Sequence, residues 1–399
     1  MEGWIRTSLG EIAKVQSGAG FPKKYQGVTD GDFPFAKVSD MNLPGNEITI
    51  HSANNWVTED VREILKAKVF PKNSIIFPKI GAAIATNKKR FVSIPCCVDN
   101  NVMGLIPNTA RVKPEFLYYW LLNHDLSDFA NDSELPSIKK TTVEKFPLSI
   151  PESLPEQERI VAMLDEAFAA IDIATANTEK NLANAKELFE SYSDRMFKNL
   201  CDTLQEKTLD DVCENLDRQR VPITKSKRVS GLVPYYGASG VVDHVDKSLF
   251  DEDLLLVSED GANLLARTYP IAFSISGPSW VNNHAHVLRF QSMAYQKFAE
   301  FYLNSISLEP FVSGMAQPKL NQTKLNTIPI PWPENDQQAS EVVKSLVAIE
   351  SESNSVSGLA EQKLSHYANL KQSLLQKAFT GELTADPKVV NRALSEASV

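Results

Sequence analysis

The chain has 399 residues, with 41 lysines and arginines against 50 aspartates and glutamates, so its net charge is −9. No apolar run approaches the roughly 20 residues that cross a bilayer, which excludes a protein with membrane-spanning helices. The four cysteines form no Cys-x-x-Cys pair, and no secretory leader is visible. We therefore expect a cytoplasmic protein without a disulfide framework, long enough for two or three domains.

Residues 1–152 are predicted to form a globular domain of strands, loops and short helices. Short apolar runs such as 74–77 and 91–94 are bounded by Pro, Gly and Asn, which is typical of strands joined by turns. The run 114–122 begins with Pro114, where proline is favoured in a first helical turn, and continues with a broad apolar face. This order predicts an α+β domain.

Residues 153–206 are predicted to form one long spacer helix. Ser153 and Glu156 have the spacing of a capping box, with Pro155 in the first turn, which indicates the start of the helix. Apolar residues then alternate in steps of four and three, with a polar interruption at Thr178. This stripe includes Ile160, Leu164, Ile171, Leu182, Phe189 and Tyr192. Because such a stripe is narrow, a second helix must cover it.

Residues 207–331 are predicted to form a second globular domain that repeats the first in less length. At one offset of 182 residues, three positions before the first helix match three before the second: Pro136 with Pro318, Thr141 with Thr323 and Pro147 with Pro329. Gly81 also matches Gly261, at an offset of 180. A unit that recurs at nearly constant offset indicates an internal repeat.

Residues 332–383 are predicted to form a second spacer helix, and residues 384–399 a flexible tail. The apolar stripe of this helix includes Val342, Leu346, Ile349, Val356, Leu359, Tyr367, Leu370 and Leu374. We expect a kink or break at 351–358, because its serines and glycine are poor helix formers. Gly381 is well placed as a C-terminal cap.

The simplest arrangement packs the two long helices against each other, antiparallel and coiled-coil-like, with one globular domain at each end. The predicted fold is therefore α+β, with two similar domains related by an internal pseudo-two-fold repeat. Residues 151–206 carry 12 acidic and five basic residues, so much of the negative charge lies on the first helix. The globular domains are close to neutral, which permits a DNA-binding surface on them.

Several segments resemble specificity subunits of type I restriction–modification systems. The junction at 146–160 (FPLSIPESLPEQERI) resembles the place where a target recognition domain of that family enters its long helix. Residues 328–333 (IPIPWP) repeat this junction, with a degraded Glu-Gln pair at 337–338. Residues 370–383 (LKQSLLQKAFTGEL) are similar to the family's C-terminal helix, and residues 9–22 to the start of a recognition domain. The resemblance covers residues 5–384.

This resemblance implies a non-catalytic subunit that binds double-stranded DNA. Each target recognition domain would read one half of a bipartite site. The helices would set the unread gap and dock two methyltransferase (M) subunits, and restriction (R) subunits would join through the complex. The resemblance implies no cofactor in this chain, because S-adenosylmethionine, ATP and Mg would belong to the partner subunits.

Basic and amide side chains in loops are the candidates for DNA contact, since such groups bind phosphates and base edges. In the first domain they are Lys23, Lys24, Tyr25, Asn87, Lys88, Lys89 and Arg90. In the second domain they are Arg218, Gln219, Arg220, Lys225, Lys227, Arg228, Tyr236 and Arg267. The alternative interpretation of each cluster is a solvated surface loop.

The sequence predicts neither a metal site nor an enzyme. His284 and His286 alternate, as residues on one face of a strand do, but no further ligand lies at a diagnostic spacing. There is no GxxxxGK[ST] phosphate loop, no Asn-Pro-Pro-Tyr-like tetrapeptide and no recognisable catalytic triad.

Two alternative functions stay open. One is a specificity subunit for a restriction enzyme in which methylase and nuclease are fused in one partner chain. The other is a coiled-coil adaptor with two protein-binding domains. Salt separates DNA binding from the adaptor, because affinity for DNA falls steeply with ionic strength.

Overall fold

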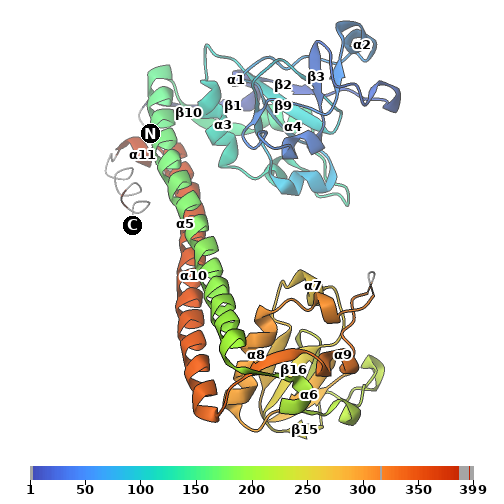
Figure 1. Ribbon diagram of the computed structural model, residues 1–399. Coiled ribbons are helices and arrows are strands. Elements are labelled where there is room, and N and C mark those ends of the chain that lie inside the picture. Colours follow the sequence, from blue (N-terminus) through green and yellow to red (C-terminus); the bar gives the residue numbers. More distant parts are fainter. Residues whose placement is uncertain (1–2, 315–316, 386–394, 396–399) are drawn as a thin grey trace. The chain divides into compact units, whose positions relative to one another are not determined.

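The computed structural model describes residues 3–314, 317–385 and 395, and the chain divides into two compact units (Figure 1). The first unit comprises residues 1–177 and 363–399, and the second comprises residues 178–362. Each unit contains one globular domain and a part of both long helices. Within the described residues, no helix is both long enough and apolar enough to span a membrane.

The first domain contains a five-stranded sheet in the order β2-β9-β6-β7-β4, a three-stranded sheet β5-β3-β8 and the pair β1-β10. Its strands are β1 (Trp4–Ser8), β2 (Ala13–Ser17), β3 (Phe33–Ala36), β4 (Thr49–Ile50), β5 (Trp56–Val57), β6 (Ile75–Pro78), β7 (Arg90–Val92), β8 (Cys97–Val98), β9 (Val102–Pro107) and β10 (Pro147–Pro151). Its helices are α1 (Leu9–Ile12), α2 (Glu59–Ile64), α3 (Pro114–Leu122) and α4 (Lys140–Lys145). The strands expected near 74–77 and 91–94 and the helix expected at 114–122 are therefore confirmed.

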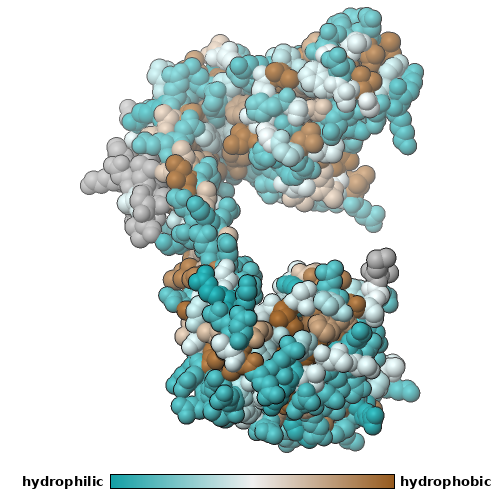
Figure 2. All heavy atoms as spheres, viewed as in Figure 1, coloured by the Kyte–Doolittle hydropathy of each residue, from teal (hydrophilic) through white to brown (hydrophobic). Residues whose placement is uncertain are grey.

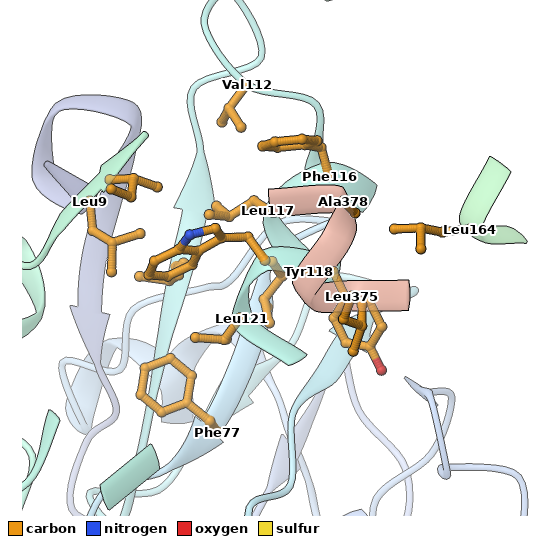
Figure 3. Close-up of a cluster of buried hydrophobic side chains, with 14 of the residues drawn as sticks. Leu9, Phe77, Val112, Phe116, Leu117, Tyr118, Leu121, Leu164, Leu375 and Ala378 are labelled. Carbon is orange, nitrogen blue, oxygen red and sulfur yellow. The ribbon is translucent and has the colours of Figure 1, made fainter. Parts of the chain in front are cut away.

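The core of the first domain continues into the helix pair. Phe116 and Leu121 of α3 lie in one buried cluster with Leu164 of the first long helix and with Leu375 and Ala378 of the second (Figure 3). Burying each of the larger side chains contributes roughly 1.5–3 kcal/mol. The helix ends in this unit are thus part of the domain's own core.

The second domain is built similarly, from the sheet β12-β19-β16-β17, the sheet β14-β13-β18-β15 and the pair β11-β20. Its strands are β11 (Gln205–Thr208), β12 (Glu214–Asn215), β13 (Val233–Gly237), β14 (Gly240–Val245), β15 (Phe250–Asp251), β16 (Leu254–Ser258), β17 (Ala272–Ile275), β18 (Pro278–Val281), β19 (Ala285–Arg289) and β20 (Pro329–Trp332). Its helices are α6 (Leu209–Val212), α7 (Asn263–Ala266), α8 (Met293–Ser305) and α9 (Gln322–Asn326). The visible faces of both domains are mainly hydrophilic (Figure 2).

The two long helices are α5 (Leu154–Thr203) and α10 (Asp336–Phe379), followed by the short α11 (Glu382–Ala385). They run antiparallel within each unit. In the first unit Arg159 donates a hydrogen bond to the carbonyl oxygen of Thr384 at 3.1 Å, and Lys371 pairs with Asp172. The residues proposed for helix packing and partner contact are Ile160, Leu164, Ile171, Leu182, Phe189, Tyr192, Val342, Leu346, Ile349, Tyr367, Leu370 and Leu374, and all twelve are buried or half-buried.

The expected break at 351–358 is wrong, because α10 runs through these residues without interruption. The hydroxyl of Ser353 is buried and donates to the carbonyl oxygen of Ala185 at 2.7 Å. Packing of small side chains against α5 therefore outweighs the weak helix propensity of serine. Val356 and Leu359, which the stripe placed in the seam, are 40% and 58% exposed. Residues 386–394 and 396–399 of the predicted tail lie outside the described residues.

Candidate nucleic-acid interface

Three loops of the first domain meet at one edge and are joined by backbone hydrogen bonds. The amide of Gly81 donates to the carbonyl oxygen of Pro136 at 2.7 Å, and that of Ile138 donates to Lys79 at 2.9 Å. The amide of Lys79 donates to Asn101 at 2.8 Å. We call residues 79–81, 99–101 and 136–138 the loop edge of the first domain. Gly81 has a φ of 66°, a conformation that favours glycine.

The second domain repeats this loop edge with residues 259–261, 282–284 and 318–320. The amide of Gly261 donates to the carbonyl oxygen of Pro318 at 3.1 Å, and that of Leu320 donates to Glu259 at 2.8 Å. The amide of Glu259 donates to His284 at 2.9 Å. The matched prolines and glycines of the sequence repeat thus mark the same hydrogen-bonded frame in both domains.

Some of the predicted basic residues are adjacent to these loop edges. Lys23 and Lys24 are exposed and follow Ala19, which forms a β-bridge with Asp99. In the second domain, Arg218 and Gln219 are exposed and follow Asp217, a buried residue that His286 links to Leu320 of the loop edge. Lys225 and Lys227 are exposed on a separate turn. The guanidinium of Arg228, which follows this turn, lies 2.9 Å from the carboxylate of Asp243 in β14. Tyr25 and Tyr236 are half-buried.

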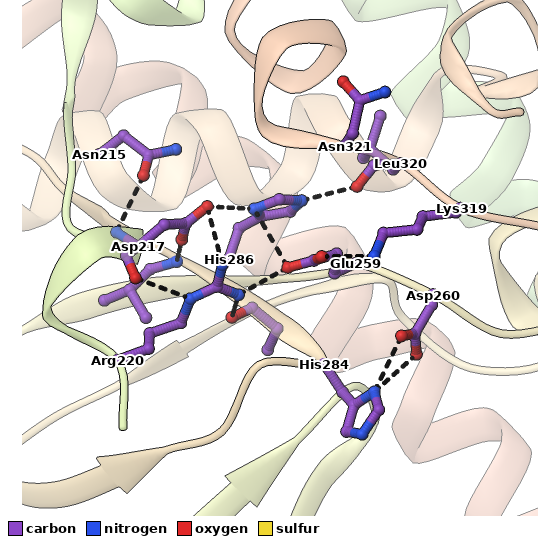
Figure 4. A network of polar contacts seen from close by, with 12 residues as sticks. Asn215, Asp217, Arg220, Glu259, Asp260, His284, His286, Lys319, Leu320 and Asn321 are labelled. Atoms are coloured by element: carbon purple, nitrogen blue, oxygen red, sulfur yellow. Dashed lines mark hydrogen bonds and ion pairs between the residues drawn. The ribbon is translucent and has the colours of Figure 1, made fainter. Parts of the chain in front are cut away.

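A buried polar network supports the second loop edge (Figure 4). Nδ1 of His286 lies 2.5 Å from Oδ2 of Asp217, and its Nε2 lies 2.8 Å from the carbonyl oxygen of Leu320. A carbonyl oxygen only accepts hydrogen bonds, so Nε2 must carry a proton. The ring of His286 therefore joins Asp217 to the loop edge, with one nitrogen against each.

Arg220 and Lys319 complete the network. Arg220 donates to Oε2 of Glu259 at 2.7 Å and pairs with Asp217 at 3.3 Å. Lys319 lies 3.1 Å from Oε1 of Glu259 and remains 52% exposed. Burial by itself raises the pKa of both carboxyl groups. The hydrogen bond from His286 holds the pKa of Asp217 below its ordinary value, and those from Arg220 and Lys319 do the same for Glu259.

The same network bears on metal binding. Asp217, Glu259 and His286 place one ligand atom each within 4.8 Å of one another, a spacing that could hold a cation. The guanidinium of Arg220, however, contacts both carboxylates. These residues therefore fit a hydrogen-bonded network that already contains its cation, and they do not fit a metal centre. His284 lies in the turn before β19, not on the strand as expected, and pairs with Asp260 at 2.8 Å.

Two predicted DNA-contact residues instead bind helix ends inside their domains. Lys89 is 2% exposed, and its ammonium donates to the carbonyl oxygen of His124, beyond the end of α3, at 2.7 Å. Burial lowers the pKa of Lys89 to about 8. Arg267 donates to the carbonyl oxygens of Leu303 and Ile306 at the end of α8. A cation near a helix C-terminus is stabilising, so both residues have structural roles.

Other candidates are also engaged within the first domain. Arg90 donates to the carbonyl oxygens of Met41 and Lys89, and Lys88 contacts the side chain of Asn42. Asn87 has a φ of 54° and its side chain accepts the amide of Leu126 at 3.0 Å. Arg220 and Arg228 have comparable internal partners in the second domain. The exposed candidates that remain are Lys23, Lys24, Arg218, Gln219, Lys225 and Lys227.

Comparison with known proteins gives one consistent family. The family "Type I restriction modification DNA specificity domain" matches residues 1–183 and 202–357. A putative type I restriction enzyme specificity subunit of Haemophilus influenzae is 37% identical over 143 residues, which is 36% of this chain and 36% of that protein. The match thus spans about a third of the length of this curated relative.

Solved structures share the fold. One from a study of complex assembly and conformational transition of the type I R-M system has a TM-score of 0.72 at 15% identity, covering 96% of this chain and 99% of its own. The HsdS subunit from Thermoanaerobacter tengcongensis has a TM-score of 0.56 at 16% identity, covering 96% and 98%. With family matches in both halves and a loop edge built twice, the chain belongs to the type I restriction–modification DNA specificity family.

Proposed function

We propose that this chain is the non-catalytic, sequence-specific DNA-binding subunit of a type I restriction–modification complex. Each target recognition domain reads one half of a bipartite site. The observation that carries this proposal is the loop edge, which is closed by the same three backbone hydrogen bonds in both domains. The second loop edge exposes His284 and Lys319 in addition to an asparagine, whereas the first exposes an asparagine alone, so we expect two different half-sites.

Electrostatics supports DNA contact at the second loop edge. The exposed Lys319 forms an ion pair with Glu259 there. Arg218 and Gln219 are exposed on the turn that contains Asp217. Lysine and arginine bind phosphates, whereas arginine and glutamine also read base edges in the major groove. The surface thus offers both kinds of contact.

The helices supply a surface for the methyltransferase subunits. In the second unit, Leu188 is 60% exposed, and Val356 and Leu359 of α10 are also exposed. A groove of about 500 Å³ between α5 and α10 is lined by apolar side chains such as Met196 and Val342. Apolar groups on a long helix favour contact with partner proteins. We propose that two M subunits bind the helices and that R subunits join through them.

Catalysis belongs to the partners in this proposal. S-adenosylmethionine, ATP and Mg would be bound by the M and R subunits. The exposed apolar helix residues also suit a protein-binding adaptor, and a fused methylase–nuclease partner would need the same DNA-reading chain. The methylation product and the salt dependence of DNA binding distinguish these functions.

The test is a methylation map of genomic DNA from cells with and without this gene, with the neighbouring methylase gene intact. Loss of one split motif, with two defined halves around a fixed unread gap, supports the proposal. An unchanged map, together with DNA affinity that does not fall with salt, contradicts it in favour of the adaptor.

A further inference from the structure

Each loop edge contains a turn of the same design. In the first domain the side chain of Asp99 accepts the amide of Asn101 at 3.0 Å, and the amide of Asp99 donates to Ala36 at 3.0 Å. Asp99 is buried, whereas Asn100, the middle residue of the turn, is exposed. The turn therefore presents one asparagine from a fixed backbone.

The second domain repeats this turn at residues 282–284. The side chain of Asn282 accepts the amide of His284 at 2.7 Å, and the amide of Asn282 donates to Tyr236 at 3.0 Å. Asn282 is buried, and the middle residue Asn283 is exposed. Asn100 and Asn283 are therefore structurally equivalent residues of the two domains.

Turn chemistry does not explain the two middle asparagines. Asparagine is common in turns because its side chain bonds the local backbone and because it tolerates positive φ. The first role belongs here to Asp99 and Asn282. Neither Asn100 nor Asn283 is among the residues with positive φ. Within the described residues, neither of their side-chain amides has a hydrogen-bond partner.

We propose that Asn100 and Asn283 are equivalent base-reading residues, each recognising an adenine in its own half-site. This inference rests on the proposed function. A carboxamide carries a donor and an acceptor side by side, and the major-groove edge of adenine offers the complementary N7 acceptor and N6 donor. The backbone frame fixes each turn before DNA binds, so little entropy is lost on contact.

Charged groups beside each turn suit phosphate contact, which positions a reader without specifying sequence. In the second domain these groups are Lys319 and Arg218, on loops that the His286 network holds against the turn. In the first domain Lys139 is exposed directly after the loop-edge residue Ile138. In each domain an exposed lysine thus lies on, or one residue beyond, a loop that backbone hydrogen bonds join, through residues 79–81 or 259–261, to the turn that carries the asparagine.

The experiment maps genomic methylation in cells that carry the full chain as wild type, Asn100→Ala or Asn283→Ala. We expect Asn100→Ala to relax one adenine position of one half-site, and Asn283→Ala to relax one adenine position of the other. Discrimination at the relaxed position should fall about 10- to 100-fold, the effect of losing one bidentate contact. Lys72→Ala and Asp253→Asn, at the opposite ends of β6 and β16, should leave the motif unchanged.

The outcomes separate the two proposals. A split motif in wild-type cells that stays unchanged in both variants overturns the role of the asparagines and leaves the proposed function intact. Relaxation at a base pair other than adenine–thymine, or in both halves by one variant, overturns it as well. The absence of any split motif in wild-type cells overturns the proposed function itself.

A variant that abolishes methylation is resolved by a second substitution. Glutamine can make the same bidentate contact with adenine. If Asn100→Gln or Asn283→Gln restores methylation of the unaltered motif, the inference stands. A different result contradicts the inference: the glutamine variants also fail to restore methylation, although the purified chains unfold at the wild-type temperature and bind DNA with the wild-type sequence preference.

Discussion

The two recognition domains share a backbone frame but fill it with different chemistry. Phe77 and Val257 are equivalent, because each lies two residues before the loop edge of its domain. Phe77 pairs with Met103 and Val257 pairs with His286, so Met103 occupies the position of His286. In the first domain Met103 is part of an apolar core. In the second domain His286 joins a network of charged groups. The frame therefore depends on matching backbone bonds, while the supporting side chains can be either apolar or ionic.

The difference has an energetic consequence. Truncating one residue of an apolar core removes contact area and leaves a cavity, whereas removing one member of a buried ionic network leaves a charge unpaired. The second domain should thus be the more sensitive to loss of a single polar group.

The largest effect is expected for Asp217→Ala. It leaves His286 and Arg220 without their shared carboxylate and should destabilise the second domain by about 3–5 kcal/mol. In the first domain Ser17 pairs with Met103 as Asp217 contacts His286 in the second, and Ser17→Ala should cost under about 1 kcal/mol. Amide hydrogen exchange, read separately for each domain, measures both changes. Equal costs in the two domains would show that the network has no special role.

Lys89 gives the first domain a distinctive pH dependence. Its folded pKa of about 8 lies below the ordinary value of 10.5, so the unfolded chain binds more protons between these pH values. The contribution of Lys89 to the free energy of unfolding therefore rises from pH 8 to pH 10.5, by on the order of 3 kcal/mol.

The measurement is the stability of wild type minus that of Lys89→Met, which lacks the titrating group, across this pH range. The subtraction cancels the thiols and phenols that titrate nearby. The free energy of unfolding of wild type should rise relative to that of Lys89→Met as the pH rises. For Lys24→Met, which removes an exposed lysine, the difference from wild type should not change with pH. A flat difference for Lys89→Met would mean that its ammonium is solvated in solution.

A smaller effect is expected where the first domain enters α5. Gln157 is buried, accepts the amide of Lys113 at 2.8 Å and donates to the carbonyl oxygens of Arg111 and Pro151. Gln157→Ala leaves these groups unpaired and should cost about 2 kcal/mol in the first unit. The equivalent of Gln157 in the second unit, at the repeat offset of 182, is the buried Ala339, whose side chain forms no hydrogen bonds. Thermal unfolding of Gln157→Ala that matches wild type would contradict this assignment.

The smallest effect is expected in the helix pair of the second unit. Ser353→Ala removes the bond to Ala185, but alanine is the better helix former, so the net change should lie within about 1 kcal/mol. Leu164→Ala in the first unit is the contrasting variant and should cost about 2–5 kcal/mol, because it opens a cavity in the core. A large loss for Ser353→Ala would show that its hydroxyl, and not close packing, holds the helices together.

Local patterns in the sequence predicted the two domains, the two long helices and their antiparallel pairing, because hydrophobic spacing and capping residues act over one or two turns. The repeat of Pro136 at Pro318 and of Gly81 at Gly261 even marked the loop edge, since both residue types are tied to backbone geometry. The continuous path of α10 through 351–358 was not predictable in this way, because the contact of Ser353 with Ala185 joins residues 168 apart in the chain.

The roles of the charged residues were decided only by the tertiary structure. Lys88, Lys89 and Arg90 are adjacent basic residues, yet of the three only Lys89 is buried, against a helix end. Lys23 and Lys24, another basic pair, are both exposed. Composition and spacing determined that this chain is a duplicated α+β protein with paired helices. Some lysine and arginine side chains face solvent and others form contacts inside a domain. The difference depends on contacts between distant segments, which charge and spacing alone do not encode.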